Sequence, residues 1–198
     1  NSLPHPGISY RAVLRDLRDR QWGDECRVDI ALQGPKSMAI LQSICDNKAD
    51  AAKLGKLPRT DVMRAKLHGF DVIISRTGYT GESVAYELFV HPDKAPDFWD
   101  LLVEVGTPLG LKPIGLGARD SLRTEAGLPL YGHELAGPLN MLPNDAGFAS
   151  YVKVFKPFFV GRDVYLKHEA ERKMDLVRFR MNEKSVRVPK GAANLEMG

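Results

Sequence analysis

The sequence predicts an α+β fold in which antiparallel strands form mixed sheets and helices pack against them. The first observation is that segments with alternating apolar and polar residues are interspersed with segments whose apolar residues recur every three or four positions. The second is a pair of alternating segments joined by a two-residue turn, which is typical of an antiparallel hairpin. Apolar residues make up 43% of the 198 residues, enough to fill a hydrophobic core.

The first predicted elements are a helix, a strand and a second helix. Residues 8–20 have apolar side chains at helical spacing, separated by Arg and Asp, which predicts an amphipathic helix. Residues 27–32 alternate and predict a short strand, which the Gly-Pro pair at 34–35 ends. Because proline is favoured in the first turn of a helix, the spaced apolar residues of 38–44 predict that a helix follows.

A hairpin and a second pair of strand and helix come next. After a polar stretch at 46–60, residues 61–67 and 70–76 alternate on either side of a His-Gly pair, which predicts a β-hairpin. Residues 85–90 predict another strand. The apolar residues spaced along 92–106 predict the helix that follows this strand.

The last third of the chain is less regular. A Pro- and Gly-rich connector at 107–115 leads into a predicted helix that includes 118–127, whereas 128–160 show no clear period. A short helix at 162–171 and an alternating strand at 177–181 complete the predicted elements. This order of elements favours the mixed α+β class.

Charge and composition argue against several classes of function. The 28 basic and 25 acidic side chains leave a net charge of +3 without a run of five like charges, so we expect no nucleic-acid partner. The apolar stretches are far shorter than the ~20 residues of a membrane helix, so we expect no membrane span. Cys26 and Cys45 are too few and too far apart for a metal knuckle or a disulfide framework, which favours a reducing compartment.

Familiar catalytic and metal-binding motifs are also missing from the sequence. Gly115 and Gly117 suggest a dinucleotide-binding loop, but Asp120 occupies the position of the third glycine. No Walker A lysine, His-Glu-x-x-His or Gly-x-Ser-x-Gly pattern occurs. The His-Glu pairs at 133–134 and 168–169 are adjacent in sequence, so their side chains point to different sides and make poor shared ligands. We therefore predict no metal site.

Three side chains remain as candidates for ligand binding. Tyr79 lies in the segment 76–82, whose two glycines let the backbone turn closely and expose its side chains. Glu87 lies in an otherwise apolar strand, where a carboxylate either faces water or accepts hydrogen bonds from a buried partner. Arg119 lies within a predicted helix and either pairs locally with Asp120 or Glu87 or anchors an anionic ligand group.

Five segments together resemble, in order and spacing, the glycine-cleavage T-protein (aminomethyltransferase) family. The segments are 32–35 (Leu-Gln-Gly-Pro), 75–82 (Ser-Arg-Thr-Gly-Tyr-Thr-Gly-Glu), 86–87 (Tyr-Glu), 115–134 (from Gly-Leu-Gly-Ala-Arg-Asp to Tyr-Gly-His-Glu) and 155–162 (Phe-Lys-Pro-Phe-Phe-Val-Gly-Arg). The resemblance extends from about residue 24 to about residue 181. The shared order of the five segments, more than any one of them, identifies the family.

The resemblance implies a folate-binding core in which Glu87 corresponds to the pterin-binding glutamate, Arg119 to a ligand-binding arginine and Tyr79 to a tyrosine of the same pocket. A carboxylate suits a pterin because the ring N–H and amino group form a two-donor edge that it can accept bidentately. Tetrahydrofolate is the implied co-substrate, and the lipoyl carrier protein of the glycine cleavage system is the implied partner. The implied reaction transfers the aminomethyl carbon from the lipoyl arm to tetrahydrofolate and releases ammonia, in the bacterial cytoplasm or the mitochondrial matrix.

The sequence departs from the family pattern in two ways. Residues 83–86 contain one residue more than the family usually has before Glu87, so we expect a bulge that keeps this carboxylate facing the pocket. The family's catalytic aspartate belongs to a segment upstream of Asn1, so we predict no catalytic residue in this chain and expect the fragment alone to be inactive. We expect residues 1–172 to form the folate-binding core, incomplete at its N-terminus, and 173–198 to begin a truncated C-terminal β-barrel domain.

Other functions remain open alongside the aminomethyltransferase. A folate-dependent demethylase of a small amine or sulfonium compound would share the fold and the folate site, so the one-carbon donor is not determined. Non-catalytic folate-binding relatives that support iron–sulfur cluster assembly have a Lys-Gly-Cys signature where this chain has Lys-Pro-Phe-Phe at 156–159. The missing cysteine argues against that role. A truncated product without activity is a further alternative.

Overall fold

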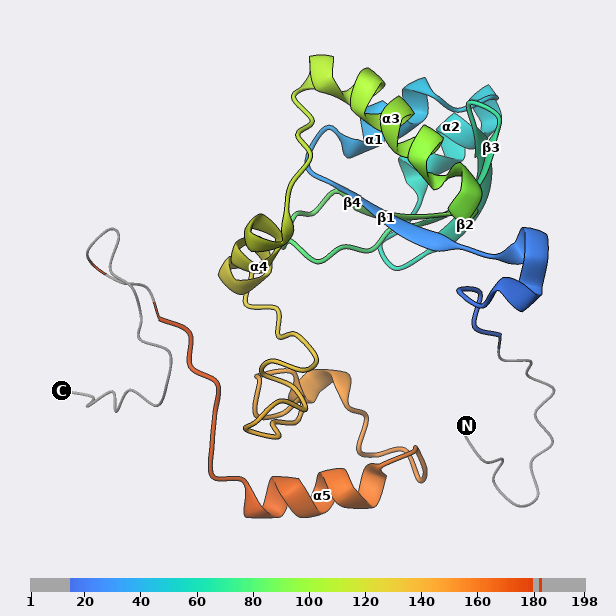
Figure 1. Cartoon of the computed structure of the whole chain (residues 1–198). Coiled ribbons are helices and arrows are strands. Elements are labelled where there is room, and N and C mark those ends of the chain that lie inside the picture. The colour runs from blue at the N-terminus through green and yellow to red at the C-terminus, as the bar shows by residue number, and fades with distance from the viewer. Residues whose placement is uncertain (1–14, 180–181, 183–198) are drawn as a thin grey trace. The chain divides into compact units, whose positions relative to one another are not determined.

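The structure is a computed structural model that describes residues 15–179 and residue 182 (Figure 1). Its contacts divide the chain into two units, Asn1–Pro129 and Leu130–Gly198. An antiparallel sheet with packed helices forms the first unit, which confirms the predicted α+β class. The predicted domain division at residue 172 stays a prediction.

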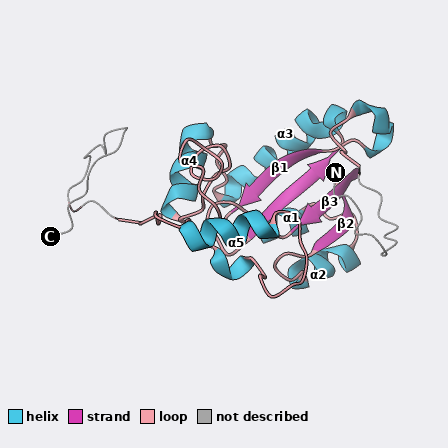
Figure 2. Cartoon of the chain, turned by 90° about the horizontal axis from the view of Figure 1, so that it is seen from below, coloured by secondary structure: helices cyan, strands magenta, loops and turns pink. Residues whose placement is uncertain are grey.

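The sheet of the first unit has four antiparallel strands in the order β1-β4-β3-β2, which lie side by side in Figure 2. The strands are β1 (Val28–Gln33), β2 (Val62–Leu67), β3 (Phe70–Ser75) and β4 (Ala85–Val90). The predicted hairpin is confirmed as β2 and β3, joined by His68 at φ 48° and Gly69 at φ 83°. Positive φ at both turn residues matches the right-handed twist of the paired strands.

The helices largely follow the predicted segments. They are η1 (Arg20–Glu25), α1 (Ser37–Ser43), α2 (Lys48–Lys56), η2 (Pro92–Lys94), α3 (Ala95–Gly106), η3 (Thr107–Leu109), α4 (Leu116–Glu125), η4 (Ala149–Tyr151) and α5 (Arg162–Glu171), where η denotes a 3₁₀ helix. Helices at 38–44, 92–106, 118–127 and 162–171 are therefore confirmed, with small shifts at their ends.

Helix α2 was not predicted, because its segment is mostly polar and small. Asn47 caps its first turn by accepting a hydrogen bond from the backbone N–H of Asp50 at 2.8 Å. Leu54 is the buried residue of the helix, so a single apolar anchor and a cap replace the apolar stripe that we expected of a helix.

Two other predictions differ from the structure. The helix at 8–20 lies outside the described residues up to position 14, and residues 15–19 form turns that lead into η1. The strand at 177–181 is wrong for residues 177–179, which form no strand, while 180–181 lie outside the described part. Alternation predicts a strand only where a partner strand accepts and donates its hydrogen bonds.

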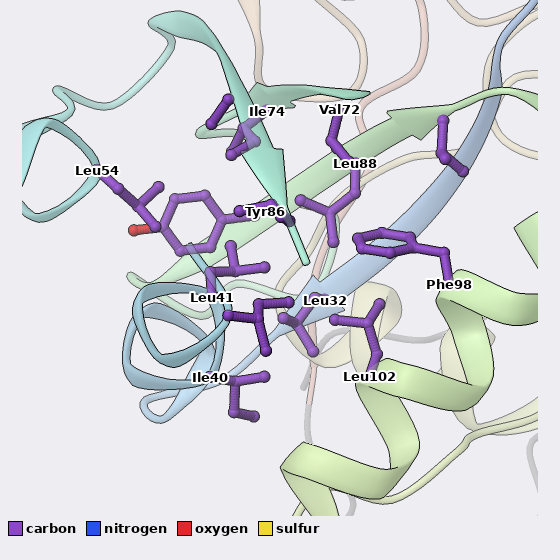
Figure 3. Packing of buried hydrophobic residues seen from close by; sticks show 14 of the residues in the cluster. Leu32, Ile40, Leu41, Leu54, Val72, Ile74, Tyr86, Leu88, Phe98 and Leu102 are labelled. Carbon is purple, nitrogen blue, oxygen red and sulfur yellow. The ribbon is translucent and has the colours of Figure 1, made fainter. Parts of the chain in front are cut away.

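The core lies between one face of the sheet and helices α1, α2 and α3 (Figure 3). Alternate residues of the strands point to this side and meet apolar side chains of the helices. The central members are Leu32, Val72, Ile74, Tyr86 and Leu88 from the sheet and Ile40, Leu41, Leu54, Phe98 and Leu102 from the helices. Because strand side chains alternate, the residues between these core positions lie on the opposite face.

The second unit contains η4 and α5, and Asp145 joins α5 to the segments around it. The Asp145 Oδ2 atom accepts the backbone N–H of Leu142 at 2.7 Å and lies 2.7 Å from His168 Nε2 on α5. The backbone N–H of Leu176 donates to the Asp145 carbonyl at 2.7 Å. His168 is thus a hydrogen-bonded structural residue in this unit.

Candidate ligand-binding site

Glu87 lies on the sheet face opposite the helices. In the strand register it stands beside Ala31 of β1 and Ser75 of β3. Its neighbours in sequence, Tyr86 and Leu88, are fully buried in the core, so the intervening carboxylate points to the other side. The register of β4 with β1 is continuous over six residue pairs, so the bulge expected before Glu87 is wrong within this described sheet.

A short chain of hydroxyl groups holds the Glu87 carboxylate. The Thr77 hydroxyl donates a hydrogen bond to Glu87 Oε2. The Ser75 hydroxyl lies 2.9 Å from the Thr77 oxygen, and it must be the donor because the Thr77 proton points at Glu87. Glu87 is half-buried, so these contacts fix the direction of a carboxylate that would otherwise turn freely in water.

Gln33, the last residue of β1, holds the loop that contains Tyr79. Its Oε1 atom accepts hydrogen bonds from the Tyr79 backbone N–H at 3.0 Å and from the Thr80 hydroxyl at 2.7 Å. Gly78 allows this approach, because a Cβ atom there would lie 2.3 Å from the Ala85 Cβ and 2.9 Å from Gln33 Oε1. The glycine of this motif is therefore required by close packing against β1 and β4.

Tyr79 and Arg119 lie together. The Tyr79 hydroxyl donates to the Pro129 carbonyl at 2.6 Å, and the Arg119 guanidinium carbon lies 5.9 Å from the centre of the Tyr79 ring. This distance allows a cation–π interaction. Asp120, the local partner considered for Arg119, is bound instead by Arg123 at 2.7 Å. The exposed Arg119 guanidinium therefore lies over an aromatic ring rather than against the neighbouring carboxylate.

Tyr79 and Arg119 line a cavity of about 1020 Å³ along β1, which is an edge strand of the sheet. This volume is at the upper end of the range of about 300–1,000 Å³ for small-molecule sites. Apolar walls come from α3, from the connector that follows it and from α4. They include Trp99, Leu102, Val103, Leu109, Ile114, Leu116 and Leu122. Glu87 does not belong to the lining, so the structure brings two of the three predicted residues together in the cavity.

Asp29 lines the same cavity and was not among the predicted site residues. Asp29 is an exposed residue, but partial burial of its carboxyl raises its pKa above the usual value, and the charge of Glu87 raises the pKa further. The charge of Arg119 and a hydrogen bond from the backbone N–H of Leu88 lower the pKa. The one feature of the sequence that singles out Asp29 is a charged residue in a strand with apolar neighbours. Only the pairing of β1 with β4 puts Asp29 diagonally beside Glu87.

Among the described residues, no group of three or more His, Cys, Asp or Glu side chains could hold a metal ion. The helices of the described part are all too short or too polar to cross a membrane.

Comparison with known proteins agrees with the family resemblance. The family model of the GCVT N-terminal domain matches residues 15–156. Proteins named Aminomethyltransferase are similar over most of the chain. One from Alkaliphilus oremlandii is 41% identical over 79% of this chain and 41% of its own length. One from Caldanaerobacter subterraneus is 41% identical over 90% of this chain and 44% of its own length.

A third protein named Aminomethyltransferase, from Streptomyces avermitilis, is 44% identical over 82% of this chain and 40% of its own length. The chain thus spans about two fifths of the length of these relatives. The family match covers well over half of the chain and includes the cavity and the Tyr79 loop. The chain therefore belongs to the T-protein (aminomethyltransferase) family, and its residues 15–156 match the GCVT N-terminal domain of that family.

Proposed function

We propose that the chain is the tetrahydrofolate-binding part of an aminomethyltransferase of the glycine cleavage system. The whole enzyme would transfer a one-carbon unit from an aminomethyl-lipoyl carrier protein to tetrahydrofolate and release ammonia, in the bacterial cytoplasm or the mitochondrial matrix. The observation that supports this most is the cavity of about 1020 Å³ in which Tyr79 and Arg119 meet. Relatives named Aminomethyltransferase support the class of reaction.

The residues of the cavity fit the chemistry of tetrahydrofolate. The guanidinium of Arg119 suits the carboxylates of the glutamate tail, which it can bind bidentately. Tyr79 and the apolar walls suit the aromatic parts of the molecule, because small-molecule sites are mostly apolar with a few polar groups that orient the ligand. Glu87 lies on the sheet face opposite the helices, where Thr77 donates a hydrogen bond to it. Its carboxylate is the proposed acceptor for the hydrogen-bond donors of the pterin ring.

Calorimetric titration of the 198-residue chain with tetrahydrofolate tests the site. Replacing Arg119 with alanine removes a charged hydrogen-bond donor, worth about 1.5–3 kcal/mol, so the affinity should fall by about 10- to 100-fold. Arg59→Ala, at an exposed position before β2, is the matched control and should bind as the wild type does. If Arg119→Ala and Glu87→Ala both bind tetrahydrofolate as tightly as the wild type, the site assignment is wrong.

The one-carbon donor is tested on the whole protein. Ammonia release should require an aminomethyl-lipoyl carrier protein together with tetrahydrofolate. A demethylase of the same fold would instead consume a small amine or sulfonium compound and form methylated or methylene folate without the carrier. Activity with the small donors alone would overturn the aminomethyltransferase proposal.

A further inference from the structure

The side-chain amide of Gln33 has an acceptor end and a donor end, and the Tyr79 loop determines which of them faces it. One atom of the amide lies 3.0 Å from the Tyr79 backbone nitrogen and 2.7 Å from the Thr80 hydroxyl oxygen. A backbone N–H only donates hydrogen bonds, so the atom that faces it must be the amide oxygen, Oε1. The opposite end of the amide is therefore Nε2, which carries two N–H donors.

The loop occupies Oε1 and leaves Nε2 unused. The two lone pairs of Oε1 accept the Tyr79 N–H and the Thr80 hydroxyl. In the part of the chain that the structure describes, Nε2 of Gln33 donates to no protein group. Nor is Nε2 one of the buried polar atoms that lack a partner in this part, so a bound molecule can reach it.

Close packing keeps the Gln33 amide in this orientation. A Cβ atom at Gly78 would lie 2.9 Å from Oε1 and 3.1 Å from Cδ of Gln33, so the loop backbone lies directly against the amide. The reversed amide would place Nε2 against the Tyr79 N–H, with two donors facing each other. The two N–H groups of Nε2 therefore form a fixed pair of donors that point away from the loop.

The cavity contains both the amide and the loop that orients it. Gln33 lines the cavity of about 1020 Å³ together with Tyr79. The cationic side chains of the lining, which are Lys36, Lys112 and Arg119, suit the carboxylates of a ligand. A neutral amide donor suits a carbonyl oxygen, and small-molecule sites orient their ligands through a few such fixed polar groups.

We propose that Gln33 binds the ligand of the cavity, with Oε1 holding the Tyr79 loop while Nε2 donates a hydrogen bond to a carbonyl oxygen of the ligand. This inference rests on the proposed function, in which the ligand is tetrahydrofolate, whose uncharged part carries carbonyl oxygens. Gln33 selects ligands by an acceptor group. Its role thus differs from that of Glu87, the proposed acceptor for donors of the ligand.

Gln33→Glu separates the two ends of the side chain. Glutamate has the same shape and keeps an oxygen for the two loop donors, but its second oxygen stands in place of Nε2. Calorimetry of the 198-residue chain with tetrahydrofolate should show an affinity lower by about 10-fold or more, because a donor is lost and an acceptor faces the ligand oxygen. Gln21→Glu makes the same change at an exposed position outside the cavity lining and should bind as the wild type does.

A salt series distinguishes the lost donor from the added charge. At 1 M salt the Debye length is about 3 Å, so a long-range effect of the negative charge in Gln33→Glu is screened. The loss of affinity should persist under these conditions. If the loss disappears, Nε2 makes no contact with the ligand, and the inference is overturned.

Hydrogen exchange of the chain without ligand tests the orientation of the amide. The Tyr79 backbone N–H should exchange as slowly in Gln33→Glu as in the wild type, because both have an acceptor for it. Exchange should be faster in Gln33→Met, which has no acceptor of comparable strength. Equally fast exchange in both variants would mean that Oε1 does not hold the loop, which overturns the inference and leaves the proposed function standing.

The binding outcomes separate the two proposals. If the folded wild-type chain does not bind tetrahydrofolate, the proposed function fails and this inference fails with it. If the wild type binds, Arg119→Ala weakens binding and Gln33→Glu binds as tightly as the wild type, the proposed function stands and Gln33 only holds the loop. Circular dichroism melting checks that each variant is folded.

Discussion

Replacing Gly78 with alanine should disturb the Tyr79 loop by steric contact alone. The new Cβ atom would lie 2.3 Å from the Ala85 Cβ and 2.9 Å from Gln33 Oε1. Carbon atoms in contact are normally about 3.5–4.0 Å apart, so the loop and β4 must separate by more than about 1 Å. Ala85 is buried and precedes the fully buried Tyr86, so the strand is a poor candidate for movement.

The magnitude follows from the two consequences of this shift. Overpacking at a close contact costs about 1–3 kcal/mol. Displacing Gln33 weakens its hydrogen bonds to Tyr79 and Thr80, each worth about 0.5–1.5 kcal/mol. We therefore expect the free energy of unfolding to fall by about 2–4 kcal/mol, and tetrahydrofolate affinity to fall with it because the Tyr79 loop lines the cavity.

Urea unfolding followed by circular dichroism measures this loss, with Gly117→Ala as the matched control. A Cβ atom at Gly117, within α4, would have no neighbour within 4 Å. Alanine there should leave stability unchanged or raise it by about 0.5–1 kcal/mol, since glycine disfavours a helix. If Gly78→Ala proves as stable as Gly117→Ala, the close packing of the loop against β1 and β4 is refuted.

Three further variants test other parts of the structure. Phe98→Ala, in the core, should lower the free energy of unfolding by about 3–5 kcal/mol in urea, and a loss below about 1 kcal/mol would contradict its full burial. Tyr79→Phe loses the hydrogen bond to the Pro129 carbonyl and should cost about 0.5–1.5 kcal/mol, measured by the same method; no change would mean that this bond does not form in solution. The pKa of Asp29 is raised in the folded chain, so the folded chain holds the proton of this carboxyl more tightly than the unfolded chain does. The free energy of unfolding therefore falls as the pH rises through that pKa. Asp29→Asn should therefore be more stable than the wild type at pH 7, and the difference should shrink as the pH falls and vanish below the ordinary carboxyl pKa of about 3.9. A difference that is independent of pH would contradict the shift.

The secondary structure could be predicted wherever the local pattern is strong. The four strands and the hairpin at His68-Gly69 follow from alternation and turn residues, and α3 follows from its apolar face. Helix α2 escaped prediction because its only buried residue is Leu54, so it has no apolar period to detect. The strand predicted at 177–179 did not form, because alternation alone supplies no partner for its backbone groups.

The candidate site could be predicted only in part. Tyr79 and Arg119 were identified from a glycine-bounded loop and a family motif, and the structure places them in contact in one cavity. Asp29 and Gln33 were missed because their one local signal, a polar residue in a strand, is shared with other polar residues of the strands. Their place at the site depends on the pairing of β1 with β4, a strand that lies more than fifty residues later in the chain.

The sequence by itself determined the class of fold, the family and most of the strands and helices, because periodicity and motifs are local properties of the chain. Tertiary structure alone decided that β1 pairs with β4, which puts Asp29 diagonally beside Glu87. It also decided that Arg119 lies over Tyr79 rather than against Asp120. Such neighbours arise from contacts between segments far apart in the chain, and strand pairing is set by the burial of a whole face rather than by any single residue.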